Sequence, residues 1–342
     1  MREKNITIYD IANEAGVSVA TVSRVMTGKA KVSADKKDRV NSLIEKYSFK
    51  PNALAKGLTD TSRKLIGIMA ADIQNPFYAT LTASCSKAAE KAGYTVMMCN
   101  SDGDESQQTE QLEKLRQQQV DAIIQLGGFT DELVSNSDYV KLVNKICQTT
   151  PVVVTGKLDG SSCRRVNIDE RKAVSLILDY LISLDHKKIA LVGGHMEVTS
   201  TYEKYQKYLE ILQEKNIEFN PDYVIQGGYS YDEGYRCAKE LMKVKNLPSA
   251  IIAINDISAA GVSRAVREAG LKIPNDISLV SYDNTYICSL FMPQLTSVGY
   301  DYASFGEALV NTAIKSSLKE NIPLLQKIEP KLFIRESCAK AK

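Results

Sequence analysis

The chain has 342 residues, of which 44% are hydrophobic and 25% are charged. This balance is typical of a globular protein with two or three domains, and it excludes a disordered or a fibrous chain. The formal net charge is only +2, but residues 1–60 carry 11 Lys/Arg and 7 Asp/Glu, whereas residues 61–342 carry 32 and 34. The basic excess therefore lies in the N-terminal segment, as nucleic-acid binding requires.

Two short helices joined by a tight turn are predicted near the N-terminus. Thr7 is a suitable N-cap for the first helix, and Gly16 stands where that helix must end. Ser18 can cap the second helix. The inward faces consist of Ile8, Ile11, Ala12 and Ala15 in the first helix and of Thr21, Val22 and Val25 in the second. This is the helix-turn-helix architecture, which places its second helix in the major groove of DNA.

A third helix is predicted to close the core of a head that spans residues 1–50. Ser33 is its expected N-cap. Its apolar positions recur at helical spacing and are Val40, Leu43, Ile44 and Tyr47. Pro51 ends this helix, because the residue before a proline is pushed out of the helical region. Residues 51–60 then form a linker or a helix that is too short to be stable alone.

From residue 61 onward, apolar strands alternate with helices. A continuous apolar run such as residues 65–69 is typical of a strand that is covered on both faces, and residues 120–124 are a further strand candidate. The alternation predicts an α/β body of doubly wound parallel sheets. We expect a second α/β unit to begin near residue 166 and the last strand to lie at residues 332–334.

Several stretches occur in the order found in a known family. In the head these are residues 7–12, 15–18, 21–25, 32–33 and 51–55 with Leu58, and in the body residues 72–78, 120–124, 255–256, 274–278 and 293–298. The chain thereby resembles the LacI/GalR family of transcriptional regulators. The resemblance implies a sequence-specific DNA-binding regulator, expected to be a repressor, that binds a palindromic operator as a homodimer. It also implies control by a small-molecule effector, such as a sugar, a sugar phosphate or a related metabolite, in a cleft between two lobes.

The same resemblance implies which residues contact DNA. Arg24 is expected to read a guanine, because a guanidinium can bond O6 and N7 together, whereas Val19 and Ala20 offer only apolar contacts. Phosphate contacts, which fix register without reading sequence, are expected from Ser18, Thr21, Ser23, Thr27, Lys31 and Ser33. Further DNA contacts are expected from Thr7, Tyr9, Asn52, Ala55, Lys56 and Leu58. The resemblance also implies that residues 51–60 are a hinge helix, in which Leu58 is expected to wedge into the minor groove and kink the duplex.

The body of the family is like that of periplasmic binding proteins, and residues 61–342 are expected to form it. Lobe 1 is expected at about residues 61–165 and 296–327, and lobe 2 at about residues 166–295 and 328–342. The chain would then cross between the lobes near residues 166, 295 and 328. The tail, residues 338–342, is too short for a heptad tetramerisation helix, which favours a dimer.

Ligands of open α/β sheets bind beyond the carboxyl ends of the strands. The resemblance places effector-binding residues there, namely Phe77, Tyr78, Ser200, Lys204, Tyr229, Asp256 and Asp283. For Phe77 a place in the core, and for Asp283 a role in holding a loop, stay open as alternatives. Lys204 stands where the family usually has an arginine, and Gly156-Lys157 replaces a common Asp-Arg pair. These departures and the retained lysines favour a phosphorylated sugar or another anion over a free sugar.

Three alternatives remain open. Residues 8–10 and 293–298 are also similar to catabolite-control regulators, which use a phosphorylated carrier protein as corepressor, although Met292 stands where these tend to have the arginine suited to a phosphoserine. A cytosolic solute-binding protein would not carry the helical head. An enzyme of sugar or nucleotide metabolism would need a catalytic pattern, which neither His186 nor His195 supplies. We therefore expect no enzymatic activity.

The first residues and the cysteines bear on the compartment. Residues 1–4 lead into the first helix without an apolar stretch, and no apolar run approaches the length of a membrane span. The seven cysteines are scattered and form no C-x-x-C pair, which predicts reduced thiols and no metal site. We expect a cytoplasmic protein with no cofactor, no metal and no membrane partner.

Overall fold

The computed structural model describes residues 6–27, 32–49 and 62–342, and the chain divides into two compact units, Met1–Arg63 and Lys64–Lys342. In the described part of the chain, no helix combines the length and the apolar character that a membrane span requires. The hinge helix expected at residues 51–60 lies outside the described residues.

The first unit contains the three expected helices, α1 (Ile8–Ala15), α2 (Val19–Thr27) and α3 (Ala34–Lys46). Thr7 caps α1 reciprocally, because its hydroxyl accepts a hydrogen bond from the Asp10 amide at 3.3 Å while the Asp10 carboxylate accepts one from the Thr7 amide at 2.8 Å. Gly16 ends α1 with φ +65°, a left-handed conformation that suits glycine. Ser18 accepts a hydrogen bond from the Thr21 amide at 3.2 Å and so begins α2.

The head has its own small core. Its fully buried side chains come from all three helices and are Ile11, Ala12, Ala15, Val22 and Val40. Glu14 on α1 accepts hydrogen bonds from Lys46 Nζ at 2.7 Å and from the Tyr47 hydroxyl at 2.8 Å, which ties α1 to the end of α3. The predicted helix-turn-helix head with a third closing helix is therefore confirmed.

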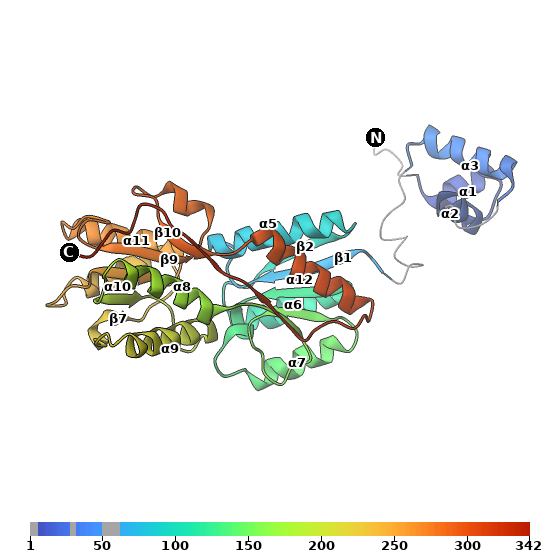
Figure 1. Ribbon diagram of the computed structural model, residues 1–342. Coiled ribbons are helices and arrows are strands. Elements are labelled where there is room, and N and C mark those ends of the chain that lie inside the picture. Colours follow the sequence, from blue (N-terminus) through green and yellow to red (C-terminus); the bar gives the residue numbers. More distant parts are fainter. Residues whose placement is uncertain (1–5, 28–31, 50–61) are drawn as a thin grey trace. The chain divides into compact units, whose positions relative to one another are not determined.

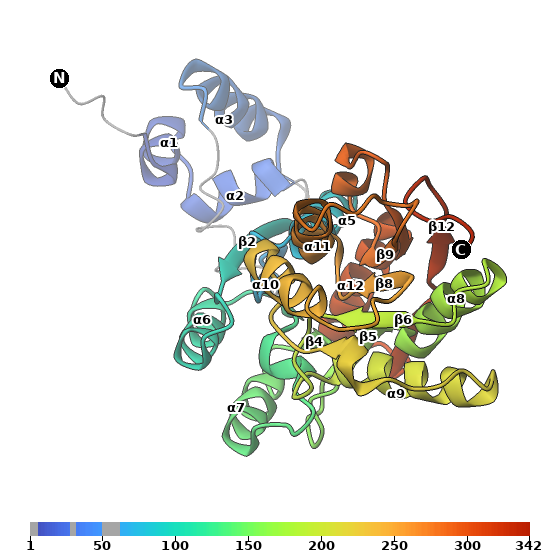
Figure 2. The same cartoon turned by 90° about the vertical axis from the view of Figure 1, so that its left-hand side faces the viewer.

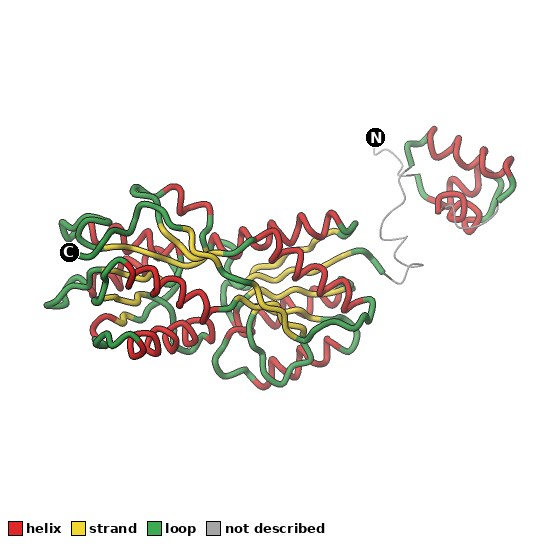
Figure 3. Tube along the Cα trace, viewed as in Figure 1, coloured by secondary structure: helices red, strands yellow, loops and turns green. Residues whose placement is uncertain are grey.

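The second unit contains two six-stranded sheets, each lying between two layers of helices (Figure 1, Figure 3). The first sheet has the order β11-β5-β4-β3-β1-β2, and all of its strand pairs are parallel. Its strands are β1 (Leu65–Ala70), β2 (Thr95–Asn100), β3 (Ala122–Leu126), β4 (Val152–Thr155), β5 (Arg164–Ile168) and β11 (Leu325–Ile328). Its helices are α5 (Pro76–Lys91) and α12 (Tyr302–Ser317) on one face, and α6 (Glu105–Gln117), η1 (Gly128–Asp131) and α7 (Ser137–Cys147) on the other.

The second sheet has the order β12-β10-β9-β8-β6-β7. Its strands are β6 (Ile189–Val192), β7 (Val224–Ile225), β8 (Ala250–Ala253), β9 (Ser278–Asp283), β10 (Thr296–Gly299) and β12 (Lys331–Phe333). Its long helices are α8 (Glu170–Ser183) and α9 (Thr199–Glu214) on one face and α10 (Tyr231–Leu241) and α11 (Asp256–Glu268) on the other, with the short turns η2 (Pro221–Tyr223) and η3 (Tyr286–Leu290). Strand β12 runs antiparallel to β10, so this sheet is not wholly parallel, and it lies beside α8 (Figure 2).

The alternation of side chains along a strand explains why both faces are apolar. Successive residues of a strand point to opposite faces of the sheet. In β3, Ile124 packs under α5 and α12, whereas its neighbour Ile123 packs under α6 and α7. A sheet covered by helices on both faces therefore needs the continuous apolar runs seen in the sequence.

The first two of the three crossings between the lobes differ from those expected. Strand β5 pairs with β4 and β11, so residues 164–168 belong to the first lobe, and the first crossing follows Ile168. Strand β10 pairs with β9, so residues 296–299 belong to the second lobe, and the second crossing follows Gly299. The third crossing lies between Ile328 and Lys331. The boundaries expected at residues 166 and 296 are thus each a few residues too early, because an apolar strand has the same pattern in either sheet and only its pairing assigns it.

Candidate functional site

Helix α2 presents one face of short and basic side chains. Ala20 and Arg24 are exposed on it, and Ser23 is half-buried. Val19 is partly buried because it packs against the core of the head. A helix whose exposed face combines small side chains with an arginine can enter the major groove closely and still read a base edge.

The other described residues expected to contact DNA lie around α2. The Ser18 hydroxyl is exposed and shares a hydrogen bond of 2.9 Å with that of Thr21. Thr7 and Ser33 are exposed just before α1 and α3, and 71% of the Tyr9 surface is exposed on α1. The side chain of Thr27 and the whole of Lys31, Asn52, Ala55, Lys56 and Leu58 lie outside the described residues. Their expected contacts stay predictions.

A cavity of about 990 Å³ lies between the two lobes of the body. Its walls come from the carboxyl ends of β-strands and the segments that follow them in both lobes. Six of the seven residues expected to bind an effector line it, namely Phe77, Tyr78, Ser200, Lys204, Tyr229 and Asp283. The structure thus brings together residues that are up to 206 positions apart in the sequence.

One wall of the cavity is aromatic. Asn75 caps α5 by accepting a hydrogen bond from the Phe77 amide at 3.0 Å, which places Phe77 and Tyr78 on the first helical turn. The Phe77 ring lies 5.1 Å from the Tyr78 ring and 6.1 Å from that of Tyr302. Burial raises the pKa of Tyr78, so its hydroxyl stays protonated and can donate a hydrogen bond. A Cβ atom at Gly127 would lie 2.1 Å from this hydroxyl, so only glycine fits there.

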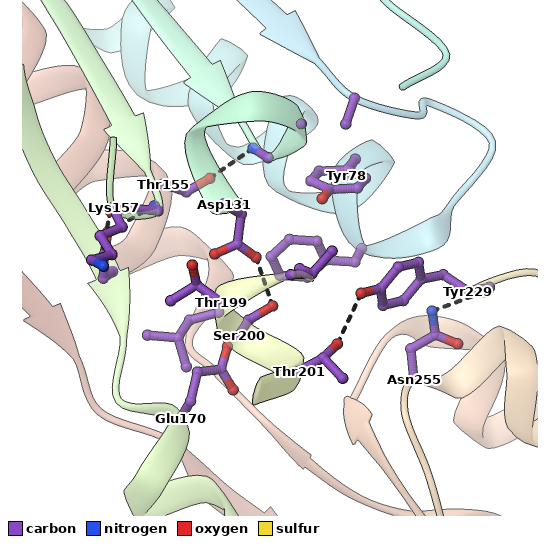
Figure 4. Close-up of a pocket in the computed structure, with 18 of the residues that line it drawn as sticks. Tyr78, Asp131, Thr155, Lys157, Glu170, Thr199, Ser200, Thr201, Tyr229 and Asn255 are labelled. Atoms are coloured by element: carbon purple, nitrogen blue, oxygen red, sulfur yellow. Dashed lines mark hydrogen bonds between the residues drawn. The ribbon is translucent and has the colours of Figure 1, made fainter. Parts of the chain in front are cut away.

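The two lobes contact each other at one edge of the cavity. Asp131, at the end of η1 in the first lobe, accepts a hydrogen bond of 2.6 Å from the hydroxyl of Ser200, at the start of α9 in the second lobe (Figure 4). Next to it, the Leu133 amide donates to the Glu197 carbonyl at 2.7 Å. On the second-lobe side, Thr201 and Tyr229 share a hydrogen bond of 2.8 Å (Figure 4). The bonds of Asp131 with Ser200 and of Leu133 with Glu197 hold the lobes together at this edge.

A buried ion pair forms the floor of the second-lobe side. Lys204 Nζ lies 2.6 Å from a carboxylate oxygen of Glu170, and the side chains are only 8% and 11% exposed. The same ammonium lies 5.0 Å from the centre of the Tyr282 ring. Burial alone would lower the pKa of Lys204, but the carboxyl groups of Glu170, Asp283 and Asp131 together outweigh it, and the pKa is raised. Lys204 is therefore a charged group that already has its counterion.

Asp256 does not line the cavity. Its carboxylate accepts hydrogen bonds from the hydroxyls of Ser281 at 2.6 Å and Ser297 at 2.8 Å, and from the amide and hydroxyl of Thr285 at 2.6 and 2.8 Å. All of these bonds are buried, and they fix the loop that follows β9. We therefore remove Asp256 from the effector-binding residues. It holds the loop that directly follows Asp283, which is the role that the sequence left open for Asp283 itself.

Comparisons with known proteins agree with this architecture. Residues 7–52 match the model for bacterial regulatory proteins of the lacI family, and residues 178–338 match that for a periplasmic binding protein-like domain. Catabolite control protein A of Staphylococcus xylosus is 35% identical over 311 residues, which cover 89% of this chain and 91% of that protein. The chain belongs to the LacI family of bacterial regulatory proteins. It is thus a DNA-binding transcriptional regulator with a ligand-binding effector domain.

Other relatives in the LacI family extend the match over the full length. Catabolite control protein A of Priestia megaterium is 32% identical over 320 residues, covering 93% of this chain and 94% of that protein. The lac repressor dimer bound to operator and an anti-inducer superposes with a TM-score of 0.88 at 24% identity, over 98% of this chain and 100% of that one. The regulator CcpA of Lactococcus lactis gives a TM-score of 0.73 at 28% identity, over 82% and 100% of the two chains.

Several cavity residues of this LacI-family chain were not predicted from its sequence. They include Gln108, Asp131, Glu170, Thr199, Thr201 and Asn255. Asp131 and Glu170 each follow the carboxyl end of a first-lobe strand, β3 and β5, so the rule that ligands bind beyond these ends could have found them. The partnership of Glu170 with Lys204 could not have been found in this way, because the two residues lie on different helices.

Replacing Asp131 with asparagine is expected to change how stability depends on pH. Burial raises the pKa of Asp131 from 3.8 to about 7, with Glu170 adding to the rise and Ser200 and Lys204 opposing it. Between these two values the folded protein holds more protons than the unfolded chain, so stability falls as pH rises from about 4 to 7. Asp131→Asn removes this loss. Relative to the wild type, the free energy of unfolding of the variant should be about 3–4 kcal/mol higher at pH 8 than at pH 4, since each pH unit between the two pKa values contributes up to about 1.36 kcal/mol.

Urea denaturation at both pH values measures this difference. Asp222→Asn, at an exposed aspartate outside the cavity, is the matched control and should leave the pH dependence unchanged. Equal pH dependence in the Asp131→Asn variant and the wild type would show that the carboxylate is not destabilised by burial.

Proposed function

We propose that this regulator is a repressor that binds a palindromic operator as a homodimer and that a small molecule in the inter-lobe cavity changes its affinity for DNA. The observation that carries the proposal is a helix-turn-helix head on the same chain as a cavity lined from both lobes. A ligand that contacts both lobes favours the closed arrangement by its difference in affinity for the closed and open forms. Coupling of that equilibrium to operator affinity is allosteric regulation, and it works in both directions.

The DNA contacts follow from the exposed face of α2. Arg24 would read a guanine, with apolar contacts from Ala20 and a smaller one from the partly buried Val19. The hydroxyls around α2 would position the head on phosphates. Leu58 would wedge into the minor groove from the hinge. Two heads on two half-sites explain how a modest basic excess gives high affinity.

A surface of the second lobe supports the homodimer. Three large apolar side chains of one short segment are exposed, Tyr286 by 67%, Leu290 by 72% and Met292 by 97%. Exposed apolar clusters on soluble proteins mark interaction surfaces. A second copy of the chain would cover this segment through a two-fold contact.

Replacing Leu290 with glutamate tests the dimer. Burying a charge in an apolar interface is costly, so Leu290→Glu should shift the protein to monomers at low micromolar concentration and weaken operator binding at least tenfold. Val134→Glu is the matched control, because Val134 is 82% exposed on the first lobe. Light scattering gives the mass and fluorescence anisotropy gives the affinity. A dimer that survives Leu290→Glu with unchanged operator affinity would exclude this interface.

We further propose that the cavity ligand is bound and released without chemical change and that the protein acts in the cytoplasm. The relatives that span the whole chain are regulators, which supports the first point. The cytoplasmic location is supported by the head, because the genomic DNA that it would read lies in the cytoplasm. Turnover of any ligand by the purified protein would contradict the first point.

A second candidate is a catabolite-control regulator that uses a phosphorylated carrier protein as corepressor. Relatives with that name cover most of the chain, which favours it. The position where such regulators tend to have arginine is Met292, whose thioether offers no charge to a phosphoserine. A rise in operator affinity on adding the serine-phosphorylated carrier protein, with no rise for the unphosphorylated form, would establish this mode.

A further inference from the structure

The charge of the inter-lobe cavity does not suit an anion. Eight acidic and five basic side chains line it. Four of the basic ones are already paired, Lys157 with Asp159, Arg171 with Glu210, Lys204 with Glu170 and Lys327 with Asp169. Among the described residues, Arg165 is then the one basic lining residue for which no ion pair is seen. The phosphorylated sugar favoured by the sequence would therefore enter a cavity with an excess of carboxylates.

Two of these carboxylates lack a cation of their own. Asp131 contacts the neutral hydroxyl of Ser200, and Asp283 lies at the end of β9 with its side chain against the cavity. The ammonium of Lys204 attracts Asp131 and Asp283 electrostatically, but it lies 2.6 Å from Glu170 and is paired with that residue. Three partly buried carboxyl groups thus share one ammonium. Burial raises the pKa of both Asp131 and Asp283, because a carboxylate at either position lacks a sufficient cation, and a bound cation would favour the ionised form of both groups.

Two buried polar groups of the cavity also lack partners among the described residues. The hydroxyl of Thr199 and the amide nitrogen of Gln108 make no hydrogen bond, although their residues are only 9% and 1% exposed. The other end of Gln108 is occupied, because its oxygen accepts bonds from the Gln125 amide group at 3.1 Å and the Phe129 amide at 3.0 Å. Buried groups left without a partner cost free energy, which a ligand with hydroxyl groups would recover.

We propose that the cavity binds a protonated amino sugar, or a similar polyhydroxylated amine, whose ammonium group contacts the carboxylates of Asp131 and Asp283. Its hydroxyl groups bond to Thr199 and Gln108. Its ring lies against Phe77 and Tyr78, whose faces attract a cation as well as a sugar ring. The cavity volume of about 990 Å³ accommodates a ligand of mono- or disaccharide size. The inference rests on the proposed function, because it names the ligand class of the same cavity.

Calorimetry on the full-length protein tests the ligand class with matched sets of sugars. Each set contains an amino sugar, its neutral parent and the 6-phosphate of that parent, in the gluco, galacto and manno configurations. At pH 7 at least one amino sugar should bind ten times more tightly than its neutral parent and than the phosphate. Equal or tighter binding of a neutral sugar or a phosphate would overturn the inference. So would the absence of heat from every amino sugar at about 10 mM.

Two isosteric variants locate the ammonium group. Asp131→Asn and Asp283→Asn should each weaken the amino sugar about tenfold or more while changing the neutral parent less than twofold. Asparagine fits position 283, where the backbone has φ +98°. The exposed control Asp222→Asn should change neither affinity. Equal weakening of the amino sugar and its neutral parent would mean that the carboxylates do not recognise an ammonium.

Operator binding measured on the same preparation separates a failure of the ligand class from a failure of the proposed function. Specific DNA binding without preference for amino sugars would overturn the ligand class alone. The absence of specific DNA binding would overturn the proposed function.

Discussion

Replacing Lys204 with methionine is expected to lower the free energy of unfolding of the body by about 3–5 kcal/mol. The variant keeps most of the side-chain volume but leaves Glu170, only 11% exposed, without its counterion. A carboxylate buried without a cation pays its full desolvation cost, or takes up a proton to avoid it. The loss should therefore be smaller at pH 5 than at pH 8. Urea denaturation followed by far-UV circular dichroism measures it, since the chain has no tryptophan.

Two further variants show whether the cause is the unpaired charge. Adding Glu170→Leu to Lys204→Met should recover most of the loss, because an apolar pair replaces the ion pair. Lys91→Met breaks the exposed pair of Lys91 with Glu307, whose side chains are 74% and 49% exposed, and should cost less than about 1 kcal/mol. If Lys204→Met lowers the free energy of unfolding no more than Lys91→Met does, Glu170 is not a buried carboxylate that depends on Lys204.

Replacing Arg24 with alanine should reduce affinity for the operator about 10- to 100-fold. A bidentate contact to guanine contributes about 1–3 kcal/mol of discrimination, and each 1.4 kcal/mol is tenfold in affinity. Arg24 is exposed on α2, away from the buried core of the head, so the fold of the head should be unchanged. Fluorescence anisotropy with operator and with scrambled DNA measures both affinities.

Arg24→Lys shows whether Arg24 reads a base or only attracts the DNA phosphates by its positive charge. Lysine keeps the positive charge but lacks the planar fork of donors. It should retain the affinity for scrambled DNA and lose most of the preference for the operator. If both variants stay within twofold of the wild type on the operator, Arg24 does not read a base.

The head could be predicted almost completely because its signals are local. Thr7 and Gly16 are the caps at the two ends of α1, and the residues that pack in the core recur at helical spacing. Strands of the body such as β1 and β3 were also predicted, because their buried residues form apolar runs. Strand β11 was missed, since it is a short edge strand whose side chains are exposed or half-buried in alternation.

The cavity was predicted less completely because it depends on side chains that meet only in three dimensions. Asn255 and Asp256 are neighbours, yet Asn255 lines the cavity while Asp256 points into the interior and holds a loop. No pattern in the sequence distinguishes the two orientations. The charge that the cavity offers to a ligand was also hard to predict. Lys204 was counted as a cation available to a ligand, whereas Glu170, on another helix, already neutralises it.

Selection of genomic DNA fragments by the purified full-length protein, followed by sequencing, tests the central claim most directly. We expect enrichment of one palindromic motif with a pyrimidine–purine step at its centre, where a wedged Leu58 would kink the duplex. We also expect that adding a mixture of cell metabolites changes the enrichment. Fragments without a common motif, both with and without metabolites, would contradict a regulator that reads DNA through α2.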